Sequence, residues 1–189
     1  MIDAIRAGTL GLPIALAIIG GMPERFAPFA ELHREAARAA GHGPATLPLS
    51  INSHGYIADT SQRAADESFG PFAATMDKIG RERGWPAMSR QAFEASRTLR
   101  GANFVGSPQE VIEKTLGFRD YVGDYQRQLF LVDHAGLPPK TVLEQLDLLG
   151  EEVVPVLRKE FAALKPAHVP DAPTHASLKA ASAVTGVPA

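Results

Sequence analysis

The segment of this 189-residue chain that says most about its architecture is LPIALAIIGG, residues 12–21. Its core, Ile14 to Ile19, is continuously apolar rather than alternating, which is typical of a strand covered on both faces in a parallel sheet. Gly20 and Gly21 then end the run. We therefore expect residues 14–19 to form a buried strand, with the glycine pair at its carboxyl end.

Helical and strand-like patterns alternate around this strand. Helical spacing predicts helices over residues 2–10 and 23–40, and a strand is expected over 47–57. The helix after that strand is expected to bend or stop near Gly70-Pro71, because proline removes a backbone donor inside a helix. Residues 84–100 then form a long excursion with short helices.

The sharpest local signal lies at Ser107-Pro108-Gln109-Glu110, after a short strand at 103–106. Serine three residues before glutamate, with proline at the first helical position, predicts a capping box and a helix start. Another strand is expected over 128–132, and a last helix that Pro155 kinks. Alternating strands and helices predict an α/β fold with a parallel sheet.

Composition narrows the function classes. The chain is 45% hydrophobic and 21% charged, as ordinary globular domains are, and its net charge is -2. That charge argues against a nucleic-acid partner. The absence of cysteine excludes disulfides and thiolate metal sites and is compatible with a cytoplasmic location. The apolar runs are too short to cross a membrane. We expect one domain over residues 1–165 and a flexible, Pro/Ala-rich tail over 166–189.

Three segments together resemble the luciferase-like, flavin-dependent monooxygenases. They are LPIALAIIGG (12–21), SHGYIADT (53–60) and FVGSPQEVIEK (104–114), and EEVVPVLR (151–158) in the last helix completes the similarity. Members of that family are (β/α)8 barrels that bind reduced FMN, or in some branches F420, at the carboxyl ends of the strands. This chain resembles only the second half, so the resemblance implies a partial (β/α)8 TIM barrel.

The resemblance also implies a reaction. It implies an FMN-dependent monooxygenase or oxidoreductase that acts on a small-molecule substrate with molecular oxygen, with NAD(P)H as the indirect reductant. The flavin carries the reactive oxygen in such chemistry, so no obligatory nucleophile need appear in the sequence. The alternative is a half-barrel that binds flavin without turnover or serves in assembly.

The candidate site residues follow from these positions. Gly20 and Gly21 suit a flavin phosphate, because glycine lets backbone N–H groups approach an anion at a helix start, although a plain tight turn would look the same. His54 lies near the carboxyl end of a barrel strand and is the candidate catalytic residue. The alternative is a histidine hydrogen-bonded within the strand end. Ser53 shares its location and is a candidate cofactor contact.

Two further positions are less specific. Arg100 ends the excursion, which corresponds to a lid near the cofactor in the resembling family, and is a candidate cofactor contact; a solvated charged segment is the alternative. His134 follows the last strand beside Asp133, which would orient or charge the ring, but a solvated loop is the simpler interpretation. No histidine spacing predicts a metal site.

An unclosed barrel has a consequence for assembly. It exposes sheet edges and one apolar sheet face. The strand at residues 14–19 carries no charge that would protect it. We therefore expect a homodimer that buries these surfaces.

Overall fold

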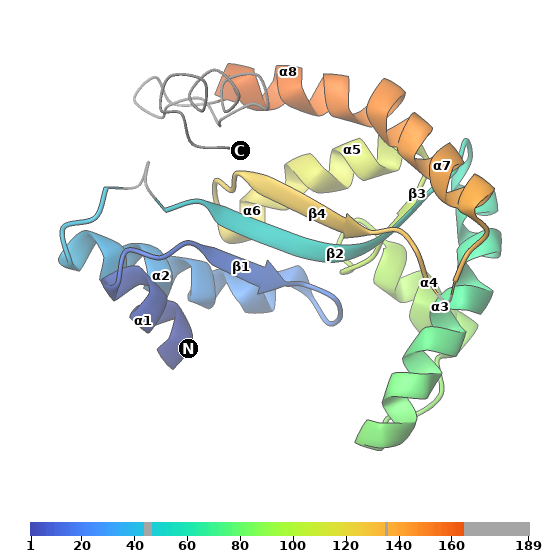
Figure 1. The fold of residues 1–189 in the computed structure, drawn as a ribbon, viewed down its shortest axis with the longest axis horizontal. Helices are drawn as coiled ribbons and strands as arrows, with labels where there is room; N and C mark the ends of the chain where they lie inside the picture. The colour runs from blue at the N-terminus through green and yellow to red at the C-terminus, as the bar shows by residue number, and fades with distance from the viewer. Residues whose placement is uncertain (44–46, 135, 165–189) are drawn as a thin grey trace, which may run out of the picture.

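The computed structural model describes residues 1–43, 47–134 and 136–164 (Figure 1). Its elements are, in order, α1 (Ile2–Thr9), β1 (Ile14–Ala17), η1 (Pro23–Phe26), α2 (Ala27–Ala39), β2 (Leu49–Ile57), α3 (Ser61–Arg83), α4 (Arg90–Arg97), β3 (Phe104–Gly106), α5 (Pro108–Gly117), α6 (Arg119–Val122), β4 (Arg127–Leu131), α7 (Pro139–Leu148), the π-helical turn η3 (Leu149–Val153) and α8 (Val154–Leu164). Strands and helices alternate as predicted. The expected tail lies outside the described residues.

All strand pairs are parallel, and the long strand β2 is common to all of them. β1 pairs with the first part of β2, with Ile14 opposite Leu49. β4 pairs with residues 50–54 of β2, and β3 pairs with its last three residues. The expected parallel α/β architecture is therefore confirmed.

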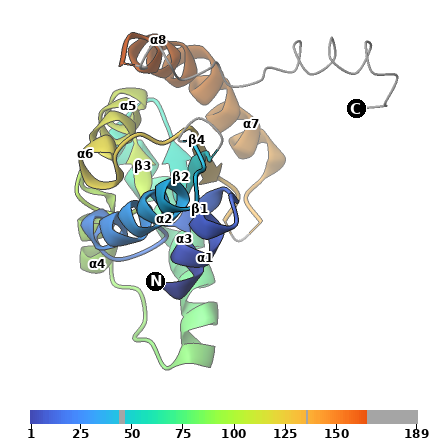
Figure 2. The same cartoon turned by 90° about the vertical axis from the view of Figure 1, so that its left-hand side faces the viewer.

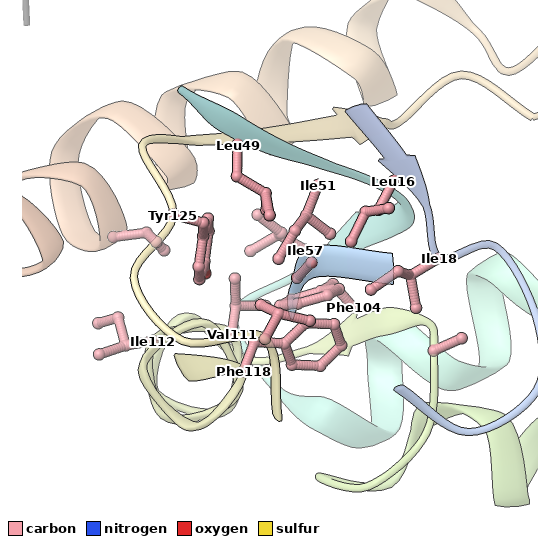
Figure 3. Close-up of a cluster of buried hydrophobic side chains, with 14 residues drawn as sticks. Leu16, Ile18, Leu49, Ile51, Ile57, Phe104, Val111, Ile112, Phe118 and Tyr125 are labelled. Carbon is pink, nitrogen blue, oxygen red and sulfur yellow. The ribbon is translucent and has the colours of Figure 1, made fainter. Parts of the chain in front are cut away.

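One face of this sheet is covered by helices. Ile51 and Leu16 point from the strands towards Phe104, Phe118 and Val111, which come from β3 and the helices behind it (Figure 3). Helices α2, α5 and α8 contribute to the same cluster, and α8 packs along α5 (Figure 2). This cluster is the main hydrophobic core.

The other face of the sheet is open, and the prediction of a strand covered on both faces is wrong. Ala15 and Ala17 of β1 are exposed, as are Asn52, Leu129 and Leu131 in the neighbouring strands. The register aligns Ala17, Asn52 and Leu129 in one row across the sheet. The continuous apolar run suits a strand whose second face looks into a closed barrel, but no strand of the described residues lies opposite.

The sequence predicted that helix α3 would bend or stop near Gly70-Pro71, but the helix does not stop there. It runs on to Arg83 with Pro71 in its interior. Phe72, beside the proline, is buried, and packing of this kind offsets the lost backbone hydrogen bond. The excursion that follows contains the short helix α4, as expected.

The predicted capping box is half formed. The Ser107 side chain accepts a hydrogen bond from the backbone N–H of Glu110. The reciprocal bond is replaced, because the Ser107 N–H donates to Oγ of Ser61 at 3.3 Å. The irregularity expected at Pro155 occurs as the π-helical turn η3 just before it. Within the described ranges, no helix is long and apolar enough to cross a membrane.

Candidate functional site

The carboxyl ends of β1, β2 and β4 lie at the same edge of the sheet, because the strands are parallel. Helices α3 and α4 stand beyond this edge (Figure 1). Side chains alternate along β2, so His54 and Tyr56 point to the face opposite Ile51 and Ile57. In barrels of this type, the carboxyl-terminal edge is where active sites are built.

Two histidines meet at this edge. His54 of β2 and His134, just after β4, are both buried, and their ring centroids are 4.9 Å apart. The ring of Phe72 from α3 packs in a T-shaped arrangement with both imidazoles, at centroid distances of 5.4 and 5.7 Å. The Nδ1 atoms of both histidines are buried without a hydrogen-bond partner among the described residues. Buried polar atoms without partners are rare and call for an explanation such as a ligand.

Burial keeps both imidazoles neutral. Desolvation lowers the pKa of His54 to about 4, and the charge of His134 adds to the effect. Desolvation also lowers the pKa of His134, although nearby Asp133 opposes it. A neutral imidazole presents one donor and one acceptor, so the pair suits an uncharged hydrogen-bonding group rather than an anion.

A glutamine that the sequence analysis missed holds this arrangement together. Gln145 of α7 is 2% exposed; its Oε1 accepts from the N–H of Ile57 at 3.3 Å, and its Nε2 donates to the carbonyl of Val132 at 3.2 Å. It thereby links the end of β2 to the segment that carries His134. No local sequence pattern marks it, because both partners are distant in the chain.

The interpretation of His134 as a solvated loop residue is wrong. The ring is 3% exposed. The carboxylate of Asp133, expected as a possible partner of the ring, instead accepts the N–H of Leu137 at 3.0 Å. This bond and the bond from Gln145 to Val132 hold the chain on either side of His134.

Arg100 contacts the segment that follows Gly20 and Gly21 at the rim beyond β1. Gly21 has a φ of +75°, and a Cβ on Gly20 would meet nothing within 4 Å. Glu24 follows the glycines in η1, and its Oε1 accepts a hydrogen bond from Nη2 of Arg100 at 2.8 Å. A backbone approach to this turn is therefore open, and Nη1 of Arg25 lies 4.0 Å from the Cβ position of Gly21. η1 has four residues, so it supplies little of the helix dipole that we expected to assist.

Ser53 lies on the other face of β2 from His54. It is fully buried, and its Oγ has no partner among the described residues. A ligand on the open face would reach Ser53 through its main chain. Across the described part of the chain, no group of three or more acidic, histidine or cysteine side chains is placed to hold a metal ion.

Comparisons with known proteins give matches to solved structures but none in sequence. No protein-family model matches the chain. No curated protein matches it in sequence either.

Solved structures do match. Monooxygenase RslO1 from Streptomyces bottropensis is 24% identical, with a TM-score of 0.63 over 82% of this chain and 45% of its own. The oxygenating constituent of 3,6-diketocamphane monooxygenase from Pseudomonas putida, solved with FMN, is 20% identical, with a TM-score of 0.57 over 80% and 44%. The F420-dependent tetrahydromethanopterin reductase from Methanopyrus kandleri is 16% identical, with a TM-score of 0.53 over 82% and 48%.

These likenesses confirm the fold resemblance drawn from the sequence. The chain has the fold of part of a (β/α)8 TIM barrel, and it spans less than half the length of each of these three structures. At these identities the comparison concerns the fold alone.

Proposed function

We propose that this chain belongs to a flavin-dependent monooxygenase or oxidoreductase, with FMN as cofactor and F420 as the alternative. The observation that carries the proposal is the buried pair His54 and His134 at the carboxyl ends of the strands, whose Nδ1 atoms have no hydrogen-bond partner among the described residues. The substrate would be a small uncharged molecule that reacts with molecular oxygen. NAD(P)H would be the indirect source of electrons.

The residues present fit a flavin in two places. The open Gly20-Gly21 turn and the guanidinium of Arg100 suit the phosphate end of FMN. The neutral imidazoles suit an uncharged polar edge such as that of the flavin ring or the substrate. When bound, the flavin would supply the electron transfer to oxygen.

The chain's own residues would orient the reacting group, form hydrogen bonds to it and exclude water. His54 would be the catalytic residue that donates or accepts a hydrogen bond at the reacting group, and His134 would fix its position. Phe72 excludes water from one side of the two rings. Ser53 stays a predicted cofactor contact, through its main chain.

The test is FMN titration followed by oxygen consumption with enzymatically reduced FMN. We expect saturable but weak binding, with a Kd above ~1 µM, because the chain spans less than half of the matched barrels. Arg100→Gln should weaken binding, and His54→Gln should lower turnover by at least ~10². His42→Gln is the matched control, because its ring bonds the carbonyl of Thr9 away from the site. No binding of either FMN or F420 would overturn the proposal.

The second candidate is a flavin-binding or assembly half-barrel without turnover. The exposed sheet face with Leu129 and Leu131 favours it, because such a face requires cover. We propose that a second copy of the chain provides the cover as a homodimer. Sedimentation at low micromolar concentration should show a dimer that Leu131→Asp dissociates. FMN binding without oxygen consumption would select this candidate.

The location follows as a further proposal. The absence of cysteine suits a protein of the reducing cytoplasm. Fractionation of cells that produce the protein at native levels would test this, and recovery outside the cytoplasmic fraction would contradict it.

A further inference from the structure

A second cavity lies between α4, β3 and α5. It has a volume of about 460 Å³, and neither His54 nor His134 lines it. Its apolar wall consists of Leu99, Phe104, Val105 and Val111. Lys114 is the most buried of the polar residues that line it.

Lys114 is unusual because its amine is buried and forms no ion pair with any described residue. It is 4% exposed, and no carboxylate among the described residues lies within ion-pair distance of its Nζ. Instead Nζ donates to the carbonyls of Thr98 at 2.7 Å and Asn103 at 2.5 Å, and it lies 5.2 Å from the ring centre of Phe104. A buried ammonium without a counter-ion is costly, so the neutral amine is favoured.

The surroundings of Lys114 favour the neutral amine on balance, mainly through burial. Desolvation lowers the pKa of Lys114 to about 7; Glu110 opposes this change, and Arg97 reinforces it. Glu94 is engaged by two arginines, Nε of Arg97 at 2.5 Å and Nε of Arg90 at 2.7 Å. The two arginines therefore offset the negative charge of Glu94, which would otherwise stabilise the ammonium of Lys114.

The two hydrogen bonds of Lys114 leave the lone pair of its neutral nitrogen available for reaction. A neutral amine has two N–H groups, which suffice for the two carbonyls, and a lone pair in the remaining tetrahedral position. Neutral, desolvated lysines of this kind are nucleophiles towards carbonyl compounds. Glu110 also lines the cavity, and no hydrogen bond or ion pair among the described residues uses its carboxylate.

We propose that Lys114 is a reactive lysine that condenses with a small aliphatic aldehyde in this cavity. The amine adds to the carbonyl carbon, and one amine proton moves to the oxygen to give a carbinolamine. The oxygen then leaves as water with the second amine proton, and a C=N bond remains. Nothing is oxidised or reduced. An aldehyde suits the site because the walls are apolar and Arg97 is already paired.

Trapping with butanal and cyanoborohydride tests the proposal without any flavin. The chain contains six lysines, of which Lys78, Lys140 and Lys159 are exposed and serve as internal references. Peptide mapping at pH 7 should show butyl-Lys114 forming at least ~10-fold faster than the references, because far more of its amine is neutral. Its labelling rate should level off above pH 7, whereas theirs should keep rising.

Two variants separate the cavity from general reactivity. Leu99→Trp narrows the cavity at a half-exposed position, so the fold should persist, and it should abolish the preference for Lys114. Lys114→Arg should remove the fast-labelled peptide and leave the others unchanged. Labelling of Lys114 no faster than that of Lys159, or unchanged by Leu99→Trp, would overturn the proposal.

Discussion

The two faces of β2 differ in the residues they carry and in what lies against them. On one face, Leu49, Ile51 and Ile57 pack against the aromatic residues of the main core (Figure 3). On the other face, Asn52 is exposed and His54 is buried beneath Phe72 of α3.

This difference separates stability from function along a single strand. The helix-covered face has the packed aromatic pairs that hold small domains together, such as Phe104 and Phe118 at 4.8 Å. The open face ends in two imidazoles whose Nδ1 atoms bond to nothing in the described part of the chain. Substitutions on the covered face should therefore unfold the chain, and those on the open face should alter binding, assembly or pH response.

The largest effect is expected from Phe118→Ala on the covered face. Phe118 is fully buried against Phe104 and Tyr121. Its truncation leaves a cavity and should lower the free energy of unfolding by about 3–5 kcal/mol. Urea denaturation followed by circular dichroism measures this. A loss below ~1 kcal/mol would mean that the covered face is not the stabilising one.

The next effect concerns pH and the open face. The pKa of His54 falls from its ordinary 6.5 to about 4 in the folded chain, mainly through desolvation. Between these values the unfolded chain binds a proton that the folded chain excludes, so stability falls as pH is lowered from 6.5 towards 4. The loss attributable to His54 is at most about 3 kcal/mol.

Urea midpoints measured between pH 7 and 4.5 provide the test. The variant His54→Gln should show a shallower pH dependence than the parent. An equal slope in the parent and in His54→Gln would show that the imidazole is not desolvated.

The sequence predicted the order of the elements well, because helical spacing and capping residues act locally. The helix start at Ser107 is one example, and the strand that begins at Ile14 is another, although it ends at Ala17 rather than at residue 19. It failed where the answer depends on distant parts of the chain. The apolar run from Ile14 does not indicate that one face of the strand is exposed. The residues near Pro71 do not indicate that the packing of Phe72 allows α3 to continue past the proline.

The candidate site shows the same limit. His54 could be selected because the end of a barrel strand is a local feature. The burial of His134 depends on Gln145, which bridges two segments that are remote in sequence. Arg100 was named for its place after the excursion, but its contact with Glu24 spans 76 residues. Pairings of this kind leave no periodic pattern that a single sequence reveals.

A smaller effect is expected at the helix caps. Ser107 caps α5, which packs on the covered face, and Ser107→Ala should lower the free energy of unfolding by about 1 kcal/mol. Ser89 caps the short helix α4 at the carboxyl edge of the sheet, so Ser89→Ala should mainly increase local opening. Hydrogen exchange of the two helices distinguishes global from local loss. If both variants lower the free energy of global unfolding equally, the covered face and the carboxyl edge of the sheet do not differ in their contribution to stability.

The smallest effect is expected from Leu129→Ala on the open face. Leu129 is 47% exposed in the single chain, so its truncation leaves no internal cavity and should cost less than ~0.5 kcal/mol in dilute solution. If a second copy covers the face, the cost should grow with protein concentration, because only the dimer buries this side chain. Thermal unfolding at two concentrations 100-fold apart makes the comparison. A loss as large as that of Phe118→Ala, independent of concentration, would show that the same chain covers both faces of its sheet.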